Sequence, residues 1–243
     1  MTQIKTLLLL VIMQVFVMAG CKHASSIIPS DFHEAVLPKL GTKEWSSLNH
    51  SSNEFEVSLV DRKLKITKVE EVAKMAKCEL KIPGGTLIGI NRGEWGGQLT
   101  FLPVDTTTKA IEIKQGNIEQ IISYKDKLYF LEGLTHDGYS AGALFELTVS
   151  GSSFTYHKLV DFDDAPSTIT SYKGMFFVAT NKNFYVVQDL KKKLIFKDVF
   201  WGGLYPNSIA PVDEKNMFLG IRGGVVKLDL TDKTLRLYKQ QEQ

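Results

Sequence analysis

Two glycine-rich segments of the sequence contain residue types that bind ligands or transfer protons. In the first, Asn91–Gly97, three glycines surround Glu94 and Trp95. Glycine permits left-handed backbone and the close approach of another group, and an indole offers a large apolar face with one hydrogen-bond donor. A sugar ring or a peptide side chain would stack on Trp95 while Glu94 accepts hydrogen bonds. The alternative is a structural turn, with Trp95 packed over the core and Glu94 paired with Arg92.

The second segment, Gly133–Gly142, places His136 beside Asp137. Histidine has an ordinary pKa of about 6.5, so it exchanges protons near neutral pH, as acid–base catalysis requires. Residues adjacent in sequence rarely orient one another for catalysis, and an enzyme would need Glu94 to converge on this pair. No second histidine stands at zinc-ligand spacing, so no zinc site is expected. A solvated polar loop is the alternative interpretation.

A third candidate is Trp201, in the segment Phe200–Asn207. Its order Trp-Gly-Gly repeats that of Trp95 and the two glycines after it. The repetition predicts one of two arrangements. Both tryptophans line one aromatic binding face, or each fills an equivalent structural slot.

Other chemistry finds little support in the sequence. Cys78 has only Lys77 nearby to stabilise a thiolate, so it is expected to be a small buried hydrophobe. Asp161–Asp164 lacks the glycine and spacing of an EF-hand, which favours a solvated turn. Neither a P-loop, a dinucleotide-binding glycine pattern nor a G-x-S-x-G motif occurs. A net charge of +2 gives no footprint for nucleic acid. No catalytic set, metal, cofactor or nucleic-acid partner is therefore predicted.

The elements that must position these residues are strands, and the chain repeats itself. Ser123–Phe130 is similar to Ser171–Phe177, and Pro211–Leu219 is a third version. Each is a turn that leads into an apolar strand. A second type of strand follows each of them, at Ala143–Leu147, Phe184–Val187 and Val225–Leu228. The units recur every 40 to 48 residues.

Such a period, all strand with turns of Gly, Asp, Asn and Lys, is typical of β-propellers. The predicted repeats are 82–117, 118–164, 165–206 and 207–240, and residues 54–81 supply strands for one more. The domain at 54–243 therefore resembles the broad class of β-propeller repeat proteins, with about five four-stranded blades. The WD dipeptide is absent, so no subfamily follows. An open β-sandwich or barrel is the alternative all-β fold.

Two segments are less regular. Residues 21–53 are rich in Ser, His and Asn and are interrupted by Pro29 and Pro38, which favours an irregular tether and entry segment. Within it, Phe32–Leu40 would fold back onto the domain. Val69–Ala76 contains several helix formers, so a short helix or a strand is expected there.

The first 20 residues have the form of an export signal. Lys5 precedes an apolar run, Leu7–Met18, which is too short to span about 30 Å of hydrocarbon. The segment Val17–Cys21 resembles the lipobox of bacterial lipoproteins. That resemblance implies that residues 1–20 are removed and that lipid on Cys21 holds the chain to a membrane. Several acyl chains on one cysteine anchor a protein stably.

The residue after the lipobox bears on location. In bacteria with two membranes, an Asp there retains lipoproteins at the inner membrane. Lys22 occupies the position, which predicts the outer membrane, facing the periplasm. With Cys21 lipidated, Cys78 has no partner and no internal disulfide is expected.

Three functions are consistent with these patterns. The first is an envelope lipoprotein whose propeller loops bind a protein or glycan partner without catalysis, through Glu94, Trp95, His136, Asp137 and Trp201. The second is a periplasmic enzyme that acts on glycan or peptide at a channel mouth. The third is an immunity-type protein that neutralises a toxin at the envelope.

Overall fold

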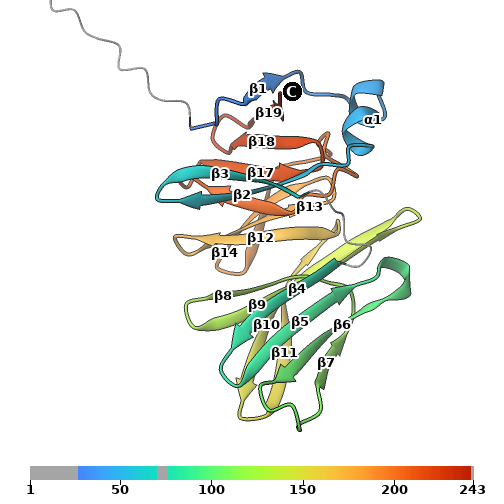
Figure 1. The fold of residues 1–243 in the computed structure, drawn as a ribbon, viewed down its shortest axis with the longest axis vertical. Helices are drawn as coiled ribbons and strands as arrows, with labels where there is room; N and C mark the ends of the chain where they lie inside the picture. The colour runs from blue at the N-terminus through green and yellow to red at the C-terminus, as the bar shows by residue number, and fades with distance from the viewer. Residues whose placement is uncertain (1–26, 70–75, 242–243) are drawn as a thin grey trace, which may run out of the picture.

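The computed structural model describes residues 27–69 and 76–241 as antiparallel β-strands with one short α-helix (Figure 1). The first elements are β1 (Phe32–Ala35), α1 (Lys43–Asn49), β2 (Glu54–Val60) and β3 (Lys63–Val69). Then come β4 (Ala76–Ile82), β5 (Gly85–Asn91), the 3-10 turn η1 (Gly93–Trp95), β6 (Gly97–Pro103), β7 (Ile111–Gln115), β8 (Ile118–Tyr124), β9 (Lys127–His136), β10 (Tyr139–Ser150) and β11 (Ser153–Phe162). The last are β12 (Pro166–Tyr172), β13 (Met175–Thr180), β14 (Phe184–Gln188), β15 (Lys191–Phe196), β16 (Ser208–Pro211), β17 (Asn216–Ile221), β18 (Gly224–Asp229) and β19 (Thr234–Gln240).

Consecutive strands pair into five separate sheets. β2–β3, β4–β7, β8–β11 and β12–β15 each form one, and β16–β19 form a fifth that β1 joins beside β19. The predicted all-β fold class is confirmed. The predicted repeats 118–164, 165–206 and 207–240 each contain one complete run of four strands.

The prediction of five four-stranded units is wrong for the first and last units. The described sheets have two, four, four, four and five strands. β4 pairs with β5 and not with β3, so residues 54–69 hold a single hairpin. In the last sheet, β1 pairs with β19 and is a fifth strand beside β16–β19.

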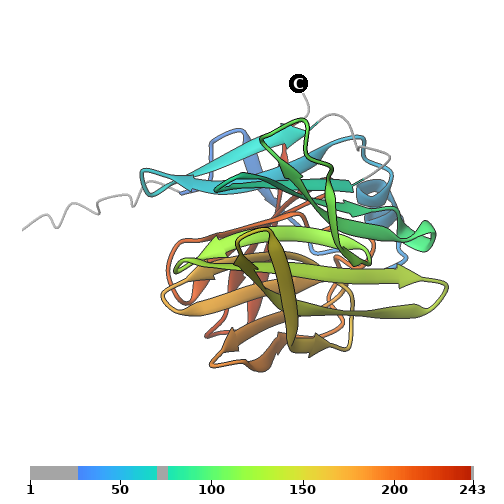
Figure 2. The same ribbon diagram turned by 90° about the horizontal axis from the view of Figure 1, so that it is seen from below.

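The first strands of successive sheets lie against one another. β8 contacts β4 and β12, β12 contacts β16, and β16 contacts β2. Figures 1 and 2 show the resulting stack of sheets. Side chains link these strands across the junctions: Gln120 Oε1 accepts from Ile169 N at 2.8 Å, and Ser208 Oγ accepts from Val57 N at 2.8 Å. Each link gives a backbone N–H in the first strand of one sheet a side-chain acceptor from the first strand of the next.

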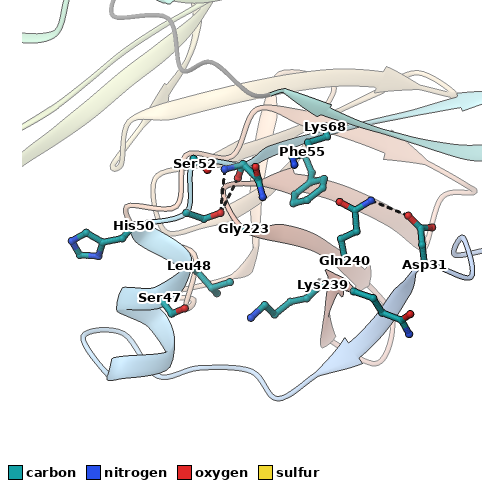
Figure 3. Close-up of a pocket in the computed structure, with 13 residues that line it drawn as sticks. Asp31, Ser47, Leu48, His50, Ser52, Phe55, Lys68, Gly223, Lys239 and Gln240 are labelled. Carbon is teal, nitrogen blue, oxygen red and sulfur yellow. Dashed lines mark hydrogen bonds between the residues drawn. The ribbon is translucent and has the colours of Figure 1, made fainter. Parts of the chain in front are cut away.

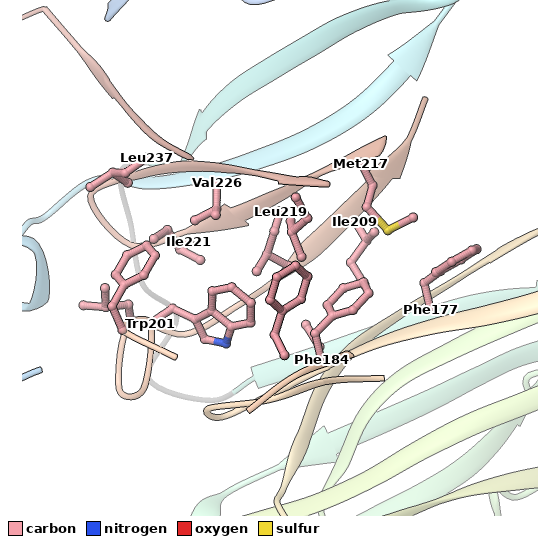
Figure 4. Packing of buried hydrophobic residues seen from close by; sticks show 14 of the residues in the cluster. Phe177, Phe184, Trp201, Ile209, Met217, Leu219, Ile221, Val226 and Leu237 are labelled. Atoms are coloured by element: carbon pink, nitrogen blue, oxygen red, sulfur yellow. The ribbon is translucent and has the colours of Figure 1, made fainter. Parts of the chain in front are cut away.

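Apolar side chains fill the spaces between adjacent sheets. Along β13, Phe177 and Ala179 belong to the cluster shared with the last sheet, while Phe176 and Val178 face the preceding sheet. β17 divides in the same way, because Met217 and Leu219 face one cluster and Phe218 the other. Figure 4 shows the cluster between β12–β15 and β16–β19. A strand buried on both faces requires a continuous apolar run, as these strands have.

The entry segment is more ordered than its composition predicted. The expected return of Phe32–Leu40 onto the domain is confirmed at β1, which pairs with β19. The helix α1 was not predicted. Thr42 caps it, since its Oγ1 accepts from Trp45 N at 3.4 Å. The helix docks through Leu48, which is buried, and through the amide of Asn49, which donates to Gly203 O at 2.8 Å.

Two other predictions concern the edges of the described chain. The signal segment 1–20 and Cys21 lie outside the described residues, as does most of Val69–Ala76. Cys78 is half-buried on β4, and burial raises the pKa of its thiol to about 11. The thiol is therefore protonated at neutral pH, in agreement with the prediction that it is not a reactive nucleophile.

Glu119 is a half-buried carboxyl on β8, close to the first strand of the neighbouring sheet. Its Oε1 accepts a hydrogen bond from Asn91 Nδ2 at 2.6 Å. Desolvation raises the pKa of the Glu119 carboxyl to about 8, because the charged form loses its hydration. The proton on this carboxyl therefore belongs to the folded structure at neutral pH.

Replacement of Glu119 by glutamine tests this burial. A carboxyl whose folded-state pKa is raised stabilises the fold fully below its ordinary pKa of about 4.5, and this contribution is lost as the pH rises through about 8. Glu119→Gln keeps the shape and removes the charge. Its melting temperature should exceed that of the parent at about pH 9 and nearly match it at about pH 5. Each 1 kcal/mol gained in the free energy of unfolding should raise the melting temperature by roughly 2–4 °C.

Thermal unfolding followed by circular dichroism across this pH range makes the measurement. Glu112→Gln, at an exposed position on β7, is the matched control and should show no such pH dependence. An equal difference between Glu119→Gln and the parent at both pH values would contradict the raised pKa.

Candidate functional site

The structure brings together Glu94, His136 and Asp137 from two turns. His136 Nε2 lies 2.9 Å from Glu94 Oε2 and 3.1 Å from Asp137 Oδ2. Glu94 belongs to η1, between β5 and β6; His136 is the last residue of β9, and Asp137 lies in the β9–β10 turn. The alternative interpretation, in which Glu94 pairs with Arg92, is wrong, because Glu94 pairs with His136.

Asparagine side chains hold the first turn. Asn91 Oδ1 accepts from Gly93 N at 2.7 Å, and the buried Asn117 donates through Nδ2 to Gly93 O at 2.8 Å. Gly93 has a φ of +61°, a left-handed conformation that glycine adopts without strain. Because Asn117 stands just before β8, the neighbouring sheet fixes the position of Glu94.

A two-residue hairpin turn presents His136. Asp137 and Gly138 have φ values of 44° and 82°, as a type I′ turn requires, and His136 pairs with Tyr139 across it. On the two strands next to the turn, Thr135 Oγ1 of β9 and Ser140 Oγ of β10 lie 3.0 Å apart. Because β9 and β10 are long strands, their turn extends as far as η1 and places His136 next to Glu94.

The cluster lies on the surface. Side-chain exposures are 41% for Glu94, 44% for His136 and 89% for Asp137. Ion pairs in such surroundings contribute little stability because water screens them. None of the three residues lines the cavity of about 790 Å³ described below. The cluster can donate hydrogen bonds to a ligand and accept them from it. An acid–base catalytic site would also need surrounding residues that exclude water.

Trp95 completes this surface. Its side chain is 72% exposed, so it does not pack over the core as the alternative interpretation required. Tyr139, 59% exposed, begins β10 beside the same turn. The β5–β6 turn, the β9–β10 turn and α1 lie along one edge of the stacked sheets, at the right in Figure 1.

A second aromatic group stands near α1. Tyr205 is 55% exposed, and the guanidinium of Arg222 lies 4.2 Å from its ring centroid. Arg222 also pairs with Glu54 at 3.0 Å and donates to Asn49 O at 3.2 Å. A cation held over an aromatic ring fixes the ring in place.

Trp201 has a different environment from Trp95. It is fully buried, its Nε1 donates to Thr180 O at 3.3 Å, and Figure 4 shows it in the cluster with Phe184 and Ile221. The hypothesis that Trp95 and Trp201 line one exposed face is therefore wrong. The two tryptophans also do not fill equivalent slots, because one precedes the third strand of its sheet and the other lies between β15 and β16.

The two tryptophans should differ in their effect on stability. Trp201→Phe removes buried volume and leaves Thr180 O without its donor, so it should lower the free energy of unfolding by about 1–3 kcal/mol. Trp95→Phe, on an exposed side chain, should change it by less than about 0.5 kcal/mol. Urea denaturation of both variants makes the comparison. Equal losses would refute the assignment of Trp201 to the core and Trp95 to the surface.

The three carboxylates of Asp161–Asp164 have different environments. Asp161 pairs with Lys158 at 2.7 Å and Asp163 with Lys192 at 3.0 Å, both on the surface. Asp164 is fully buried and accepts from Ser140 Oγ at 2.6 Å and from Lys182 N at 2.7 Å. The predicted solvated turn is thus wrong for Asp164. Across residues 27–69 and 76–241, no group of three His, Cys, Asp or Glu side chains is arranged to hold a metal ion.

The structure also contains a cavity that sequence reasoning missed (Figure 3). It has a volume of about 790 Å³ and lies among α1, the start of β2 and the end of β19. Its lining comes from segments almost 200 residues apart, such as Ser47 and Lys239, so no local motif could have indicated it.

Comparison with known proteins adds no family. No protein-family model matches the chain, and no curated protein matches it. Within the part of the chain that the structure describes, no helix has the length and apolar character needed to cross a membrane. Functional assignment therefore depends on the geometry of the sites.

Proposed function

We propose that this chain is an envelope lipoprotein whose β-propeller-like domain binds a protein or glycan partner, without catalysis, through the loops at one edge of its sheets. The observation that carries the proposal is the exposed indole of Trp95, which stands on a fixed turn beside Glu94, His136 and Asp137. Lipid on Cys21 would tether the domain to the outer membrane, facing the periplasm.

Three features support the propeller-like arrangement. Successive runs of four strands form separate antiparallel sheets, and their first strands lie side by side. β1, from the beginning of the described chain, joins the sheet that contains its last strands. In β-propellers, strands from the two ends of the chain often share a blade and so close the ring. The hairpin β2–β3 would be a short blade of the same ring.

Binding through Trp95 follows from its exposure and its rigidity. An indole in water is an unfavourable arrangement that contact with a sugar ring or an apolar side chain relieves. The hydrogen bonds of Asn91 and Asn117 hold the turn before a ligand arrives, which reduces the entropy lost on binding. The nearby carboxylates and imidazole would direct polar groups of the partner. Aromatic anchors of this kind carry much of the energy of interfaces.

The second candidate is a periplasmic enzyme that acts on glycan or peptide. The convergence of His136 with Glu94 and Asp137 favours it, since a histidine between two carboxylates is a recurrent acid–base arrangement. The exposure of all three side chains favours binding instead. Product release from envelope glycan or peptide by the parent, with loss in His136→Gln, would support the enzyme. Neutralisation of a toxin is a special case of protein binding.

Capture from envelope extracts tests the binding surface. The parent should retain a partner that the double variant Glu94→Ala, Trp95→Ala loses at least tenfold, because removal of an anchor costs about 2 kcal/mol or more. Val104→Ala is the matched control: its side chain is 76% exposed, at the opposite end of β6. Circular dichroism checks that each variant is folded. Protease treatment of the extract separates a protein partner from a glycan.

Two outcomes would count against this surface. If the double variant captures the same partner as the parent, the Glu94–Trp95 turn is structural. If neither the parent nor any variant captures a partner, the proposed edge is not an interface. The search for a ligand then moves to small solutes.

Lipidation is tested at the two cysteines. A palmitate analogue fed to cells that make the full chain should label the parent and Cys78→Ser equally, and Cys21→Ser should carry no label. Membrane fractions separated by density should place the parent in the outer membrane. Label that survives in Cys21→Ser would overturn the lipoprotein assignment without affecting the binding surface.

A further inference from the structure

The cavity near α1 has the size and the walls of a small-molecule site. Its volume of about 790 Å³ falls within the range of about 300–1,000 Å³ that such sites occupy. Leu48 and Phe55, both buried, form an apolar part of the lining. Figure 3 shows the opening between α1 on one side and the strands that carry Gln240 and Phe55 on the other.

Polar groups line the rest of the cavity. Ser47, Ser51 and Ser52 contribute hydroxyls, and Asn53 and Gln240 contribute amides. Ser51 Oγ accepts from Asn53 N at 3.1 Å, and Gln240 Nε2 donates to Asp31 Oδ2 at 2.9 Å. The side-chain amide of Asn53 makes no hydrogen bond to any other described residue. These groups suit a ligand that carries hydroxyls.

The charge of the lining is positive. Two lysines, Lys68 and Lys239, line the cavity together with one carboxylate, that of Asp31, which already accepts a hydrogen bond from Gln240. His50 stands at the rim, and its ring points away from the cavity in Figure 3. The balance of the cavity therefore favours an anion.

Lys239 is the lining residue whose charge an anion would compensate most directly. It is half-buried on β19, and its side chain reaches toward Ser47 and Leu48 (Figure 3). Its ammonium forms no ion pair or hydrogen bond with any of the residues that the structure describes. A partly desolvated charge without a partner is unfavourable, and a bound carboxylate or phosphate would compensate it.

The wall beside Lys239 is built into the fold. Gly223, in the β17–β18 turn, has a φ of +77°, and a Cβ at this position would come within 2.8 Å of Leu48 Cδ2. Only glycine fits there without displacing α1. Gly223 N donates to Asn53 O at 2.9 Å, so the turn also fixes the polar wall. The cavity is thus formed before any ligand binds.

We propose that this cavity binds a small polar anion, with a carboxylate or phosphate group at Lys239 and hydroxyl groups at the wall formed by Ser51 and Asn53. A carboxylate and a phosphate share the required chemistry, and two probes distinguish them. The site is separate from the surface at Trp95 and independent of the function proposed for it.

Calorimetric titration of the full chain in a non-ionic detergent tests the proposal with three matched sugars. Glucuronate supplies a carboxylate, glucose 6-phosphate supplies a phosphate, and glucose is neutral. At least one of the two anions should bind with a dissociation constant of about 1 mM or tighter, and glucose should bind at least about tenfold more weakly. The tighter of the two anions identifies the preferred group. If neither anion binds, or if glucose binds equally well, the proposal is overturned.

Lysine variants connect the binding to the cavity. Lys239→Gln should weaken binding of the preferred anion at least about tenfold, and Lys193→Gln, at an exposed position on β15, should leave it unchanged. Lys68→Gln is a second variant, with a smaller loss expected because Lys68 is exposed. Binding that survives both cavity variants would place the anion elsewhere and overturn the assignment. Glu94→Ala, Trp95→Ala should bind the anion as the parent does, which keeps this test apart from that of the partner surface.

Discussion

The burial of each sheet between its neighbours is the constraint on which the rest of the structure depends. β13 and β17 have no face for water, because successive side chains on each strand enter different apolar clusters. A sheet of this kind is stable only in a stack, since its two faces must both be covered. The stack in turn decides which turns become neighbours. The contact between η1 and the β9–β10 turn is therefore a consequence of how two sheets pack.

Polar residues at the junctions between sheets adjust that packing. Asn117 holds the Glu94 turn, Asp164 joins Ser140 to the β13–β14 turn, and Arg222 joins Glu54 to the end of α1. Each of these side chains is buried or largely buried, so its hydrogen bonds are costly to break. They tie a turn of one sheet to the connection that enters another. The candidate surface at Trp95 and the cavity at Lys239 both stand beside such junctions.

The sequence was informative where the structure depends on local pattern. The strand periodicity around Leu128–Phe130 and Phe176–Phe177, and the weak thiolate environment of Cys78, were sufficient to predict the strands and an inert thiol. The convergence of Glu94 with His136 required a hairpin of a particular length, which no single motif specifies. Trp95 and Trp201 share a local motif and differ in tertiary environment, so the motif could not distinguish them. The cavity joins residues from both ends of the chain and has no local signature at all.

The two candidate sites suit ligands of different size. At Glu94 and His136 water has free access, so electrostatic interactions there are weak and an extended partner is needed to exclude solvent. A macromolecule that covers Trp95 would do so, whereas a small solute would leave the cluster wet. The cavity at Lys239 is concave and has a polar wall, so one small ligand would fit within it. An anion bound there would also lie against α1 and the β17–β18 turn, and it would stabilise the junction that holds the first hairpin to the last sheet.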